Sequence, residues 1–226
     1  MLKQNLDKVF SEISSGNNLG EPITLVGASK TMSVEKINQA ITFGLKVVAE
    51  NKVQEFREKN SFIDANASQH FIGHLQTNKV KYLVGKVDLI HSVDSVKLAQ
   101  EIDKECLKKG VNQDVLIEVN VGGELSKSGF APDSVISAVN KISNECKRVR
   151  IKGLMTMLPH VDDESLIASL CEKMRALYDA LKNGGYDFNY LSMGMSADYK
   201  IAIKHGSNMI RLGSGIFGQR NYGEVK

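Results

Sequence analysis

The sequence predicts an α/β fold, a single (β/α)8 TIM barrel with one extra helix at its N-terminus. Eight short apolar runs alternate with helical patterns along the chain. Most of these runs are continuously apolar, which is typical of buried strands in a parallel sheet. The count of eight favours a closed barrel over an open doubly wound sheet, and 226 residues suit a compact barrel.

The hydrophobic spacing and the helix-capping signals place each element in order. The extra helix is expected over residues 2–13, and it ends at the glycine-rich break 16–20. Strands are expected at 23–30, 46–51, 69–74, 87–93, 114–121, 150–157, 190–194 and 208–213. Helices are expected at 34–43, from about 52 through 59, and at 78–84, 95–109, 132–147, 162–182 and 196–205.

No linker or low-complexity segment divides the chain, so residues 1–226 are expected to form one domain. Within it, residues 1–16 would hold the N-terminal helix and residues 23–218 the barrel. The glycine-rich breaks at 122–123 and 184–185 then become loops of that domain.

Composition excludes several classes of function. The net charge of +3, with no block of five or more basic residues, gives no reason to expect nucleic acid as a partner. No apolar run approaches membrane-spanning length, and the N-terminus lacks the apolar core of a signal peptide. The three cysteines are far apart without CxxC spacing, which indicates reduced thiols and a cytoplasmic protein. The five histidines are scattered, so no metal site is expected.

The first strand ends in a single lysine. The run Ile23–Thr31 is apolar until Lys30, which stands at the C-terminal tip of the strand. Active sites of barrel enzymes form at this end of the strands, and an amine placed there can act as a nucleophile. The alternative is an ordinary lysine that ends a strand by reaching solvent.

A loop suited to phosphate follows the last strand. The segment Gly213–Gly218 matches GxGxxG, but only eight residues follow it, too few for a dinucleotide-binding unit. Its small residues would instead let backbone N–H groups approach an anion, and barrels commonly hold phosphate after strands 7 and 8. Ser196, after strand 7, can cap the next helix and direct free amides to the same place. Turn glycines and an ordinary serine cap are the alternative.

Arg211 lies in the otherwise apolar eighth strand, and a buried guanidinium needs a partner. That partner is either a ligand at the barrel mouth or a strand carboxylate such as Glu118. A lysine amine, a phosphate loop and an arginine together suit pyridoxal 5′-phosphate (PLP), with Lys30 holding it as a Schiff base. A sugar-phosphate aldolase would use the same groups, although its lysine more often lies on a middle strand.

Several blocks of sequence resemble the pyridoxal phosphate homeostasis protein family. They run in order over nearly the whole chain, at residues 26–31, 50–55, 70–79, 153–155, 192–198, 206–213 and 216–218. The resemblance implies a fold-type III PLP-binding barrel, similar to the N-terminal domain of alanine racemase.

The resemblance also implies roles for individual residues. Lys30 would carry the cofactor, Arg211 would face its pyridine nitrogen, and Asn51 would line its ring. The remaining implied cofactor-binding residues are Met155 beside the ring, Ser196, Gly213 and Ser214 at the phosphate, and Lys127 in the loop after strand 5. Residue composition alone would make Lys127 a solvated lysine. His74, at the end of strand 3, is a further candidate for lining the pocket.

The family is regarded as a binder and distributor of PLP that affects vitamin B6 and amino-acid balance. Apo forms of PLP-dependent enzymes are the implied recipients, and a monomer is expected. The chain ends at Lys226, soon after the barrel closes, so no C-terminal β-domain is expected to bring a second acid/base residue. An open site of this kind suits loading and release of the cofactor without robust catalysis. The alternative is a PLP-dependent amino-acid racemase or lyase of low activity.

Overall fold

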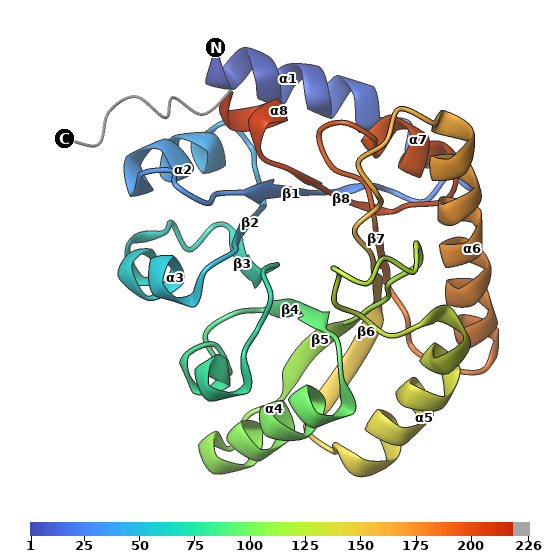
Figure 1. Ribbon diagram of the computed structural model, residues 1–226. Helices are drawn as coiled ribbons and strands as arrows, with labels where there is room; N and C mark the ends of the chain where they lie inside the picture. Colours follow the sequence, from blue (N-terminus) through green and yellow to red (C-terminus); the bar gives the residue numbers. More distant parts are fainter. Residues whose placement is uncertain (219–226) are drawn as a thin grey trace.

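The computed structural model describes residues 1–218, and its eight strands close into one parallel barrel in sequence order (Figure 1). This confirms the predicted fold class. The barrel closes where β1 pairs with β8, from Thr24 opposite Met209 to Gly27 opposite Leu212. The strands are β1 (Thr24–Ala28), β2 (Val47–Glu50), β3 (Ser68–Phe71), β4 (Leu89–Val93), β5 (Gln113–Glu118), β6 (Val149–Met155), β7 (Tyr190–Ser192) and β8 (Met209–Leu212).

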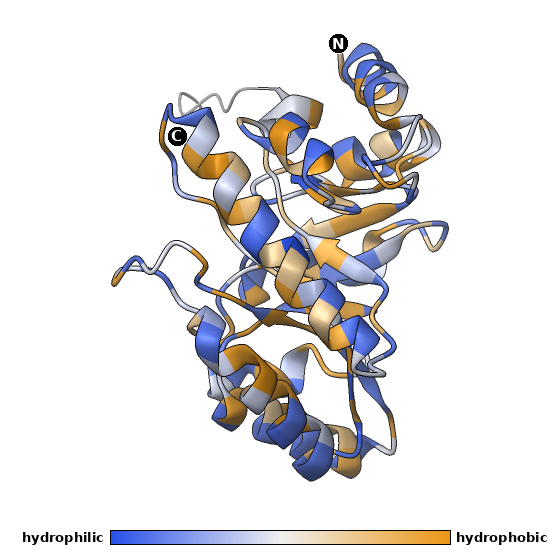
Figure 2. Ribbon diagram, turned by 90° about the vertical axis from the view of Figure 1, so that its right-hand side faces the viewer, coloured by the Kyte–Doolittle hydropathy of each residue, from blue (hydrophilic) through white to orange (hydrophobic). Residues whose placement is uncertain are grey.

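Helices surround the barrel and connect its strands. They are α1 (Leu2–Ile13), α2 (Val34–Thr42), α3 (Val53–Lys59), α4 (Val96–Lys109), α5 (Val135–Glu145), α6 (Glu164–Asn183), α7 (Tyr199–Lys204) and α8 (Ser214–Phe217). Three short 3-10 helices, η1 (Asn60–Phe62), η2 (Thr77–Tyr82) and η3 (Pro132–Ser134), complete the set. Figure 2 shows α6 across the front with hydrophilic and hydrophobic residues interspersed, as expected of a helix with one face on the barrel.

The predicted N-terminal helix is confirmed as α1, which flanks the barrel and contacts α8 (Figure 1). Leu6 and Val9 of α1 are buried in one cluster with Ile216 of α8. The Asn5 side-chain amide also donates to the Ile216 carbonyl at 3.0 Å. The first helix of the chain therefore supports the segment that follows the last strand.

Several element boundaries differ from the prediction. Strand β3 ends at Phe71 and not at residue 74, because the chain turns at Gly73, close against the Asn51 carbonyl. Strand β5 ends at Glu118 and not at residue 121, because Val119 instead bridges to Phe130 of the following loop. The helix expected at 78–84 is the 3-10 helix η2, and the helix expected from residue 132 begins with η3 before α5. The segment predicted as a glycine-rich loop after β8 contains α8.

The barrel interior has an apolar layer with polar residues above it. Buried apolar side chains from six strands form the layer, namely Val26, Val47, Ala49, Leu89, Leu116, Met155 and Met209. Toward the C-terminal ends of the strands the buried residues become polar, among them His91, Ser192 and Arg211. Buried polar groups are costly without hydrogen bonds, so this layer is where a function is expected.

Two further features concern residues 1–218. No helix in this part of the chain is long and apolar enough to cross a membrane. The thiols of Cys106, Cys146 and Cys171 are buried and unpaired, and burial raises their pKa values to about 11, 11 and 12.

Candidate functional site

Lys30 stands in a tight turn directly after β1. The Met32 amide donates to the Ser29 carbonyl at 3.0 Å, which closes the turn around Lys30 and Thr31. Thr31 has a φ of +67°, the left-handed region that β-branched residues rarely adopt. Its amide is held by the Glu55 carboxylate at 2.8 Å. A strained backbone held by a carboxylate from another element is typical of a functional position.

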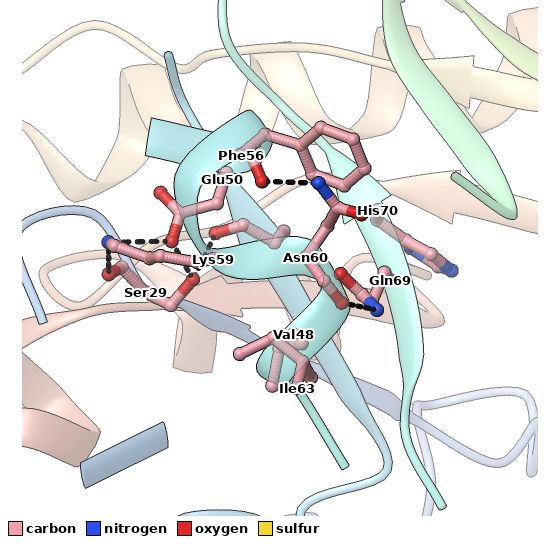
Figure 3. A pocket seen from close by; sticks show the side chains of 10 residues that line it. Ser29, Val48, Glu50, Phe56, Lys59, Asn60, Ile63, Gln69 and His70 are labelled. Atoms are coloured by element: carbon pink, nitrogen blue, oxygen red, sulfur yellow. Dashed lines mark hydrogen bonds and ion pairs between the residues drawn. The ribbon is translucent and has the colours of Figure 1, made fainter. Parts of the chain in front are cut away.

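A cluster of polar side chains from β2, α3 and the turn itself holds this turn in place (Figure 3). The Lys59 amine of α3 lies 3.0 Å from Glu50 and 3.0 Å from Glu55. The Ser29 hydroxyl donates to Glu50 at 2.7 Å and to the Ala49 carbonyl at 3.1 Å. Figure 3 shows Lys59 reaching toward Glu50 and Ser29, where these residues border a small cavity of about 10 Å³. Side chains on β2 and α3 thus fix the backbone on both sides of Lys30.

The two carboxylates of this cluster respond differently to their surroundings. Burial raises the pKa of Glu50, although hydrogen bonds from Ser29 and Lys59 oppose the shift. Burial alone would also raise the pKa of Glu55, but bonds from the Thr31 amide and Lys59 lower it overall. Glu55 therefore stays ionised at neutral pH and continues to accept the hydrogen bond from the Thr31 amide.

The two predicted phosphate-binding segments meet in the structure. The Gly215 amide donates to the Ser196 hydroxyl at 3.3 Å, which joins the segments after β7 and β8. A Cβ placed on Gly213 would lie 3.6 Å from the Ala28 carbonyl, so this glycine sits beside the end of β1. Ser196, Ser214 and Gly215 are exposed, so their polar groups are accessible to an anion. Both segments therefore lie at the same edge of the barrel as Lys30.

Arg211 is buried inside the barrel and is held by neutral acceptors. Its Nη1 donates to the Ser192 carbonyl at 3.0 Å and to the Ser192 hydroxyl at 2.7 Å, and its Nη2 donates to the Thr156 carbonyl at 2.9 Å. Complete burial lowers its pKa to about 10, opposed by the charges of Asp198 and Glu118. In the part of the chain that the structure describes, Arg211 forms no ion pair, so the alternative of a direct pair with Glu118 is wrong.

A chain of buried polar side chains continues from Arg211 across the barrel. The Ser192 hydroxyl lies 3.5 Å from His91 Nδ1, and His91 Nε2 lies 3.0 Å from His70 Nδ1. Burial lowers the pKa of His70 to about 4, partly offset by Asp88. Burial also lowers the pKa of His91 well below its ordinary value, with His70 and Arg211 adding to the effect. Both imidazoles are thus neutral at pH 7.

The buried histidine pair predicts a loss of stability in acid. In the unfolded chain both histidines take up protons below about pH 6.5. In the folded chain His70 resists protonation until about pH 4, and burial lowers the pKa of His91 as well. The free energy of unfolding should therefore fall as the pH drops through this window, by about 2 kcal/mol at pH 5 for His70 alone. Urea unfolding at pH 7.5 and pH 5 measures the loss.

The variant His70→Gln/His91→Gln should lose at least about 2 kcal/mol less than the parent protein between these two pH values. His160→Gln, which changes an exposed histidine, is the matched control and should behave like the parent. An equal loss in the parent and the double variant would rule out the buried pair as the cause.

Asn51 and Met155 occupy different depths of the mouth. Asn51 follows β2, and its side-chain Oδ1 is buried without a hydrogen-bond partner. A buried acceptor of this kind has lost its hydrogen bonds to water, and this costs free energy unless a ligand donates a hydrogen bond to it. Met155, at the end of β6, is 1% exposed and packs in the apolar layer beneath the mouth.

Lys127 and His74 both lie near the ends of the strands. Lys127 is half-buried, and its amine pairs with Glu124 at 2.5 Å and donates to the carbonyls of Met157 and Leu158. His74 is exposed, and its Nδ1 lies 3.3 Å from Asp94. No group of three or more metal-ligating side chains occurs within residues 1–218.

Sequence reasoning missed the residues that support the site. Glu55 and Lys59 have the i,i+4 spacing of an ordinary helical pair, so nothing in their pattern pointed to the Lys30 turn. His70 lies inside a strand-like run, and a polar side chain that faces the barrel interior from such a run would have indicated a functional residue. To use this signal, one must know which alternate residues of the strand face the interior, and the sequence alone did not show this.

A family model described as the N-terminal domain of alanine racemase matches residues 24–221 of the chain. Among curated relatives, the pyridoxal phosphate homeostasis protein of Aquifex aeolicus is 42% identical over 224 residues. The match covers 97% of this chain and 95% of that protein. The chain belongs to the pyridoxal phosphate homeostasis protein family. The predicted resemblance is thereby confirmed.

Two solved structures show the same architecture. PipY of Synechococcus elongatus has been solved with PLP bound, and that chain is 27% identical to this one. It superposes with a TM-score of 0.85 over 96% of this chain and 100% of that one. Alanine racemase of Clostridium difficile superposes with a TM-score of 0.81 at 16% identity, which shows the fold alone. All of this chain aligns there with 58% of the racemase.

Proposed function

We propose that the chain binds PLP at the mouth of the barrel and acts in vitamin B6 homeostasis. Family membership supports this function, as does the PLP-bound structure of PipY. The observation that carries it is the pairing of β1 with β8, because it places the turn of Lys30 beside the loop of Gly213. An amine and an anion-binding loop on neighbouring strands suit a ligand that carries an aldehyde and a phosphate.

The residues at the mouth fit this cofactor. The buried Oδ1 of Asn51 lacks a partner, and a ligand with hydrogen-bond donors would complete it. Ser196 and Gly215 lie together in one exposed place, where a phosphate could replace their 3.3 Å hydrogen bond and accept from both the hydroxyl and the backbone N–H. Arg211 carries a positive charge that no carboxylate within residues 1–218 neutralises by direct contact.

When bound, the cofactor supplies an aldehyde that condenses with a primary amine. We assign Lys30 as that amine, which holds the cofactor as a Schiff base in a turn fixed by Glu55. Arg211 would lie on the side of the pyridine nitrogen and, being cationic, would disfavour its protonation. The other assigned contacts are Ser196, Gly213 and Ser214 at the phosphate, Asn51 and Met155 at the ring, and Lys127 and His74 at the rim.

Reductive trapping tests this assignment. The full-length protein is incubated with PLP, reduced with borohydride and digested, and the modified peptide is identified by mass spectrometry. The adduct is expected on Lys30, with loss of the visible absorption band on reduction. An adduct found instead on Lys127, or spread over surface lysines, would overturn the site.

The Ser196→Ala variant should bind PLP about tenfold more weakly than the parent protein, since one hydrogen bond to a charged group is worth about 1.5 kcal/mol or more. Titration followed by absorbance gives the two dissociation constants. Ser165→Ala serves as the control, because Ser165 is exposed at the start of α6, where its hydroxyl meets only Asp163. Equal affinities for Ser196→Ala and the control would remove Ser196 from the phosphate site.

We further infer a setting for this activity. Residues 1–226 act as one domain, as a monomer in the cytoplasm, where three buried free thiols are compatible with a reducing environment. The bound cofactor is passed to apo forms of PLP-dependent enzymes. Mixing the loaded protein with such an apo-enzyme, in the presence of a trap for the free aldehyde, tests direct transfer. Recovery of enzyme activity despite the trap is expected, and its absence would mean that the cofactor is released first.

A further inference from the structure

A second concave feature lies beside the barrel mouth. It is a cleft of about 220 Å³ formed by the start of α3, the segment after β3 and the end of η2. Two of the sequence blocks singled out above, residues 50–55 and 70–79, come together in its walls. The lining residues are Asn51, Lys52, Val53, Gln54, Arg57, His74, Gln76, Lys79 and Tyr82.

The cleft is basic. Three of its lining residues, Lys52, Arg57 and Lys79, are basic, and no carboxylate is among them. Within residues 1–218 none of these three cations forms an ion pair, whereas Lys59 on the same helix as Arg57 binds two carboxylates. Several like charges around one concavity raise the local concentration of anions.

One wall of the cleft is aromatic and holds two of the cations. The Arg57 guanidinium carbon lies 4.3 Å from the centre of the Tyr82 ring, and the Lys79 amine lies 6.0 Å from it. These distances are within the range of cation–π attraction. Tyr82 therefore restrains the Arg57 side chain most strongly, with Lys79 at the outer limit of the attraction and Lys81 also 5.1 Å from the ring centre.

We propose that this cleft is a second, non-covalent binding site for a small phosphate monoester. Its volume lies below the roughly 300 Å³ at which pockets for drug-sized ligands begin, so the ligand is small. Guanidinium and ammonium groups bind phosphate through charge-assisted hydrogen bonds, and the side-chain amide of Gln76 can bind a hydroxyl group. The Gln54 amide already donates to Glu58 at 2.6 Å. Because the cleft shares Asn51 with the proposed cofactor site, a ligand there lies next to the mouth.

The primary site must be blocked to test the second one. Full-length protein is loaded with PLP, reduced with borohydride, and then titrated by calorimetry at physiological salt. The two probes are pyridoxamine 5′-phosphate, which has no aldehyde, and glycerol 3-phosphate. Saturable binding of at least the first probe is expected. Tighter binding of pyridoxamine 5′-phosphate assigns the cleft to B6 vitamers, and equal binding assigns it to the phosphate alone.

The variant Arg57→Gln/Lys79→Gln should weaken this binding at least about tenfold, since it removes two charge-assisted contacts. Lys97→Gln/Lys173→Gln removes the same net charge from exposed lysines elsewhere and should bind as the parent does. No saturable binding, or an equal effect of both double variants, would overturn the proposal. So would tighter binding of a short RNA through Arg57 and Lys79.

The cleft experiment is separable from the test of the proposed function. The adduct on Lys30 reports the cofactor site whether or not a second ligand binds. If no adduct forms there, the titration is carried out on Lys30→Ala protein, in which the amine is absent and the cleft residues are unchanged.

Discussion

Lys30→Ala protein is expected to form no borohydride-stable adduct with PLP, whereas the parent protein should carry about one per chain. Lys30 is the residue at the C-terminal end of β1, and its turn is closed by the Met32 amide and held by Glu55. Other lysines near the strand ends lack this setting. Lys59, for example, is committed to Glu50 and Glu55.

Absorbance spectra before and after reduction, with the intact mass, measure this effect. Lys52→Ala is the matched control, because Lys52 also follows a strand near the mouth, but it is exposed and is not among the assigned cofactor contacts. The control should keep the full adduct. An adduct of normal yield on Lys30→Ala protein would show that another amine carries the cofactor. Circular dichroism should be the same for all three proteins, because a lysine-to-alanine change at the mouth leaves the apolar layer intact.

Gly153→Ala is expected to destabilise the barrel by about 3 kcal/mol or more. Gly153 lies in β6 opposite Tyr190 of β7, with a φ of +148°. A Cβ there would stand 1.8 Å from the Tyr190 carbonyl oxygen, and both groups belong to paired backbone that has no flexible end to move aside. The strain of this backbone conformation for a residue with a side chain adds to the clash.

Urea unfolding followed by circular dichroism measures the change in the free energy of unfolding. Gly122→Ala is the control, because Gly122 is exposed and a Cβ there would meet only the flexible end of Glu124 at 3.4 Å. The control should change stability by less than about 1 kcal/mol. A comparably small effect of Gly153→Ala would mean that β6 and β7 can separate locally without cost to the barrel.

The sequence was sufficient to predict the barrel because its strands are buried on both faces and so form continuous apolar runs. It could not predict where β3 and β5 end. Those ends depend on the close approach of Gly73 to the Asn51 carbonyl and on the bridge from Val119 to Phe130, contacts between segments. The helix α8 was not predicted because Gly215 within it and the glycines at both of its ends are typical of a loop, and the helix depends on packing against α1.

The proximity of the candidate site residues could be predicted in part from the order of the strands. Lys30, Ser196 and Gly213 follow strands, so the topology of the barrel alone brings them to one edge. The supporting cluster of Glu50, Glu55 and Lys59 requires knowledge of how α3 packs on β2. The histidine pair requires the register in which His70 of β3 lies opposite Leu89 of β4, two residues before His91.

The seam between β1 and β8 has a consequence for synthesis of the chain. The proposed amine anchor belongs to the first strand and the proposed phosphate loop to the segment after the last, and only their pairing makes them neighbours. A nascent chain that has not yet released β8 from the ribosome therefore contains Lys30 but no complete site. The cofactor can therefore bind only after the barrel has closed. Once bound, it would link the first and last strands and stabilise their pairing.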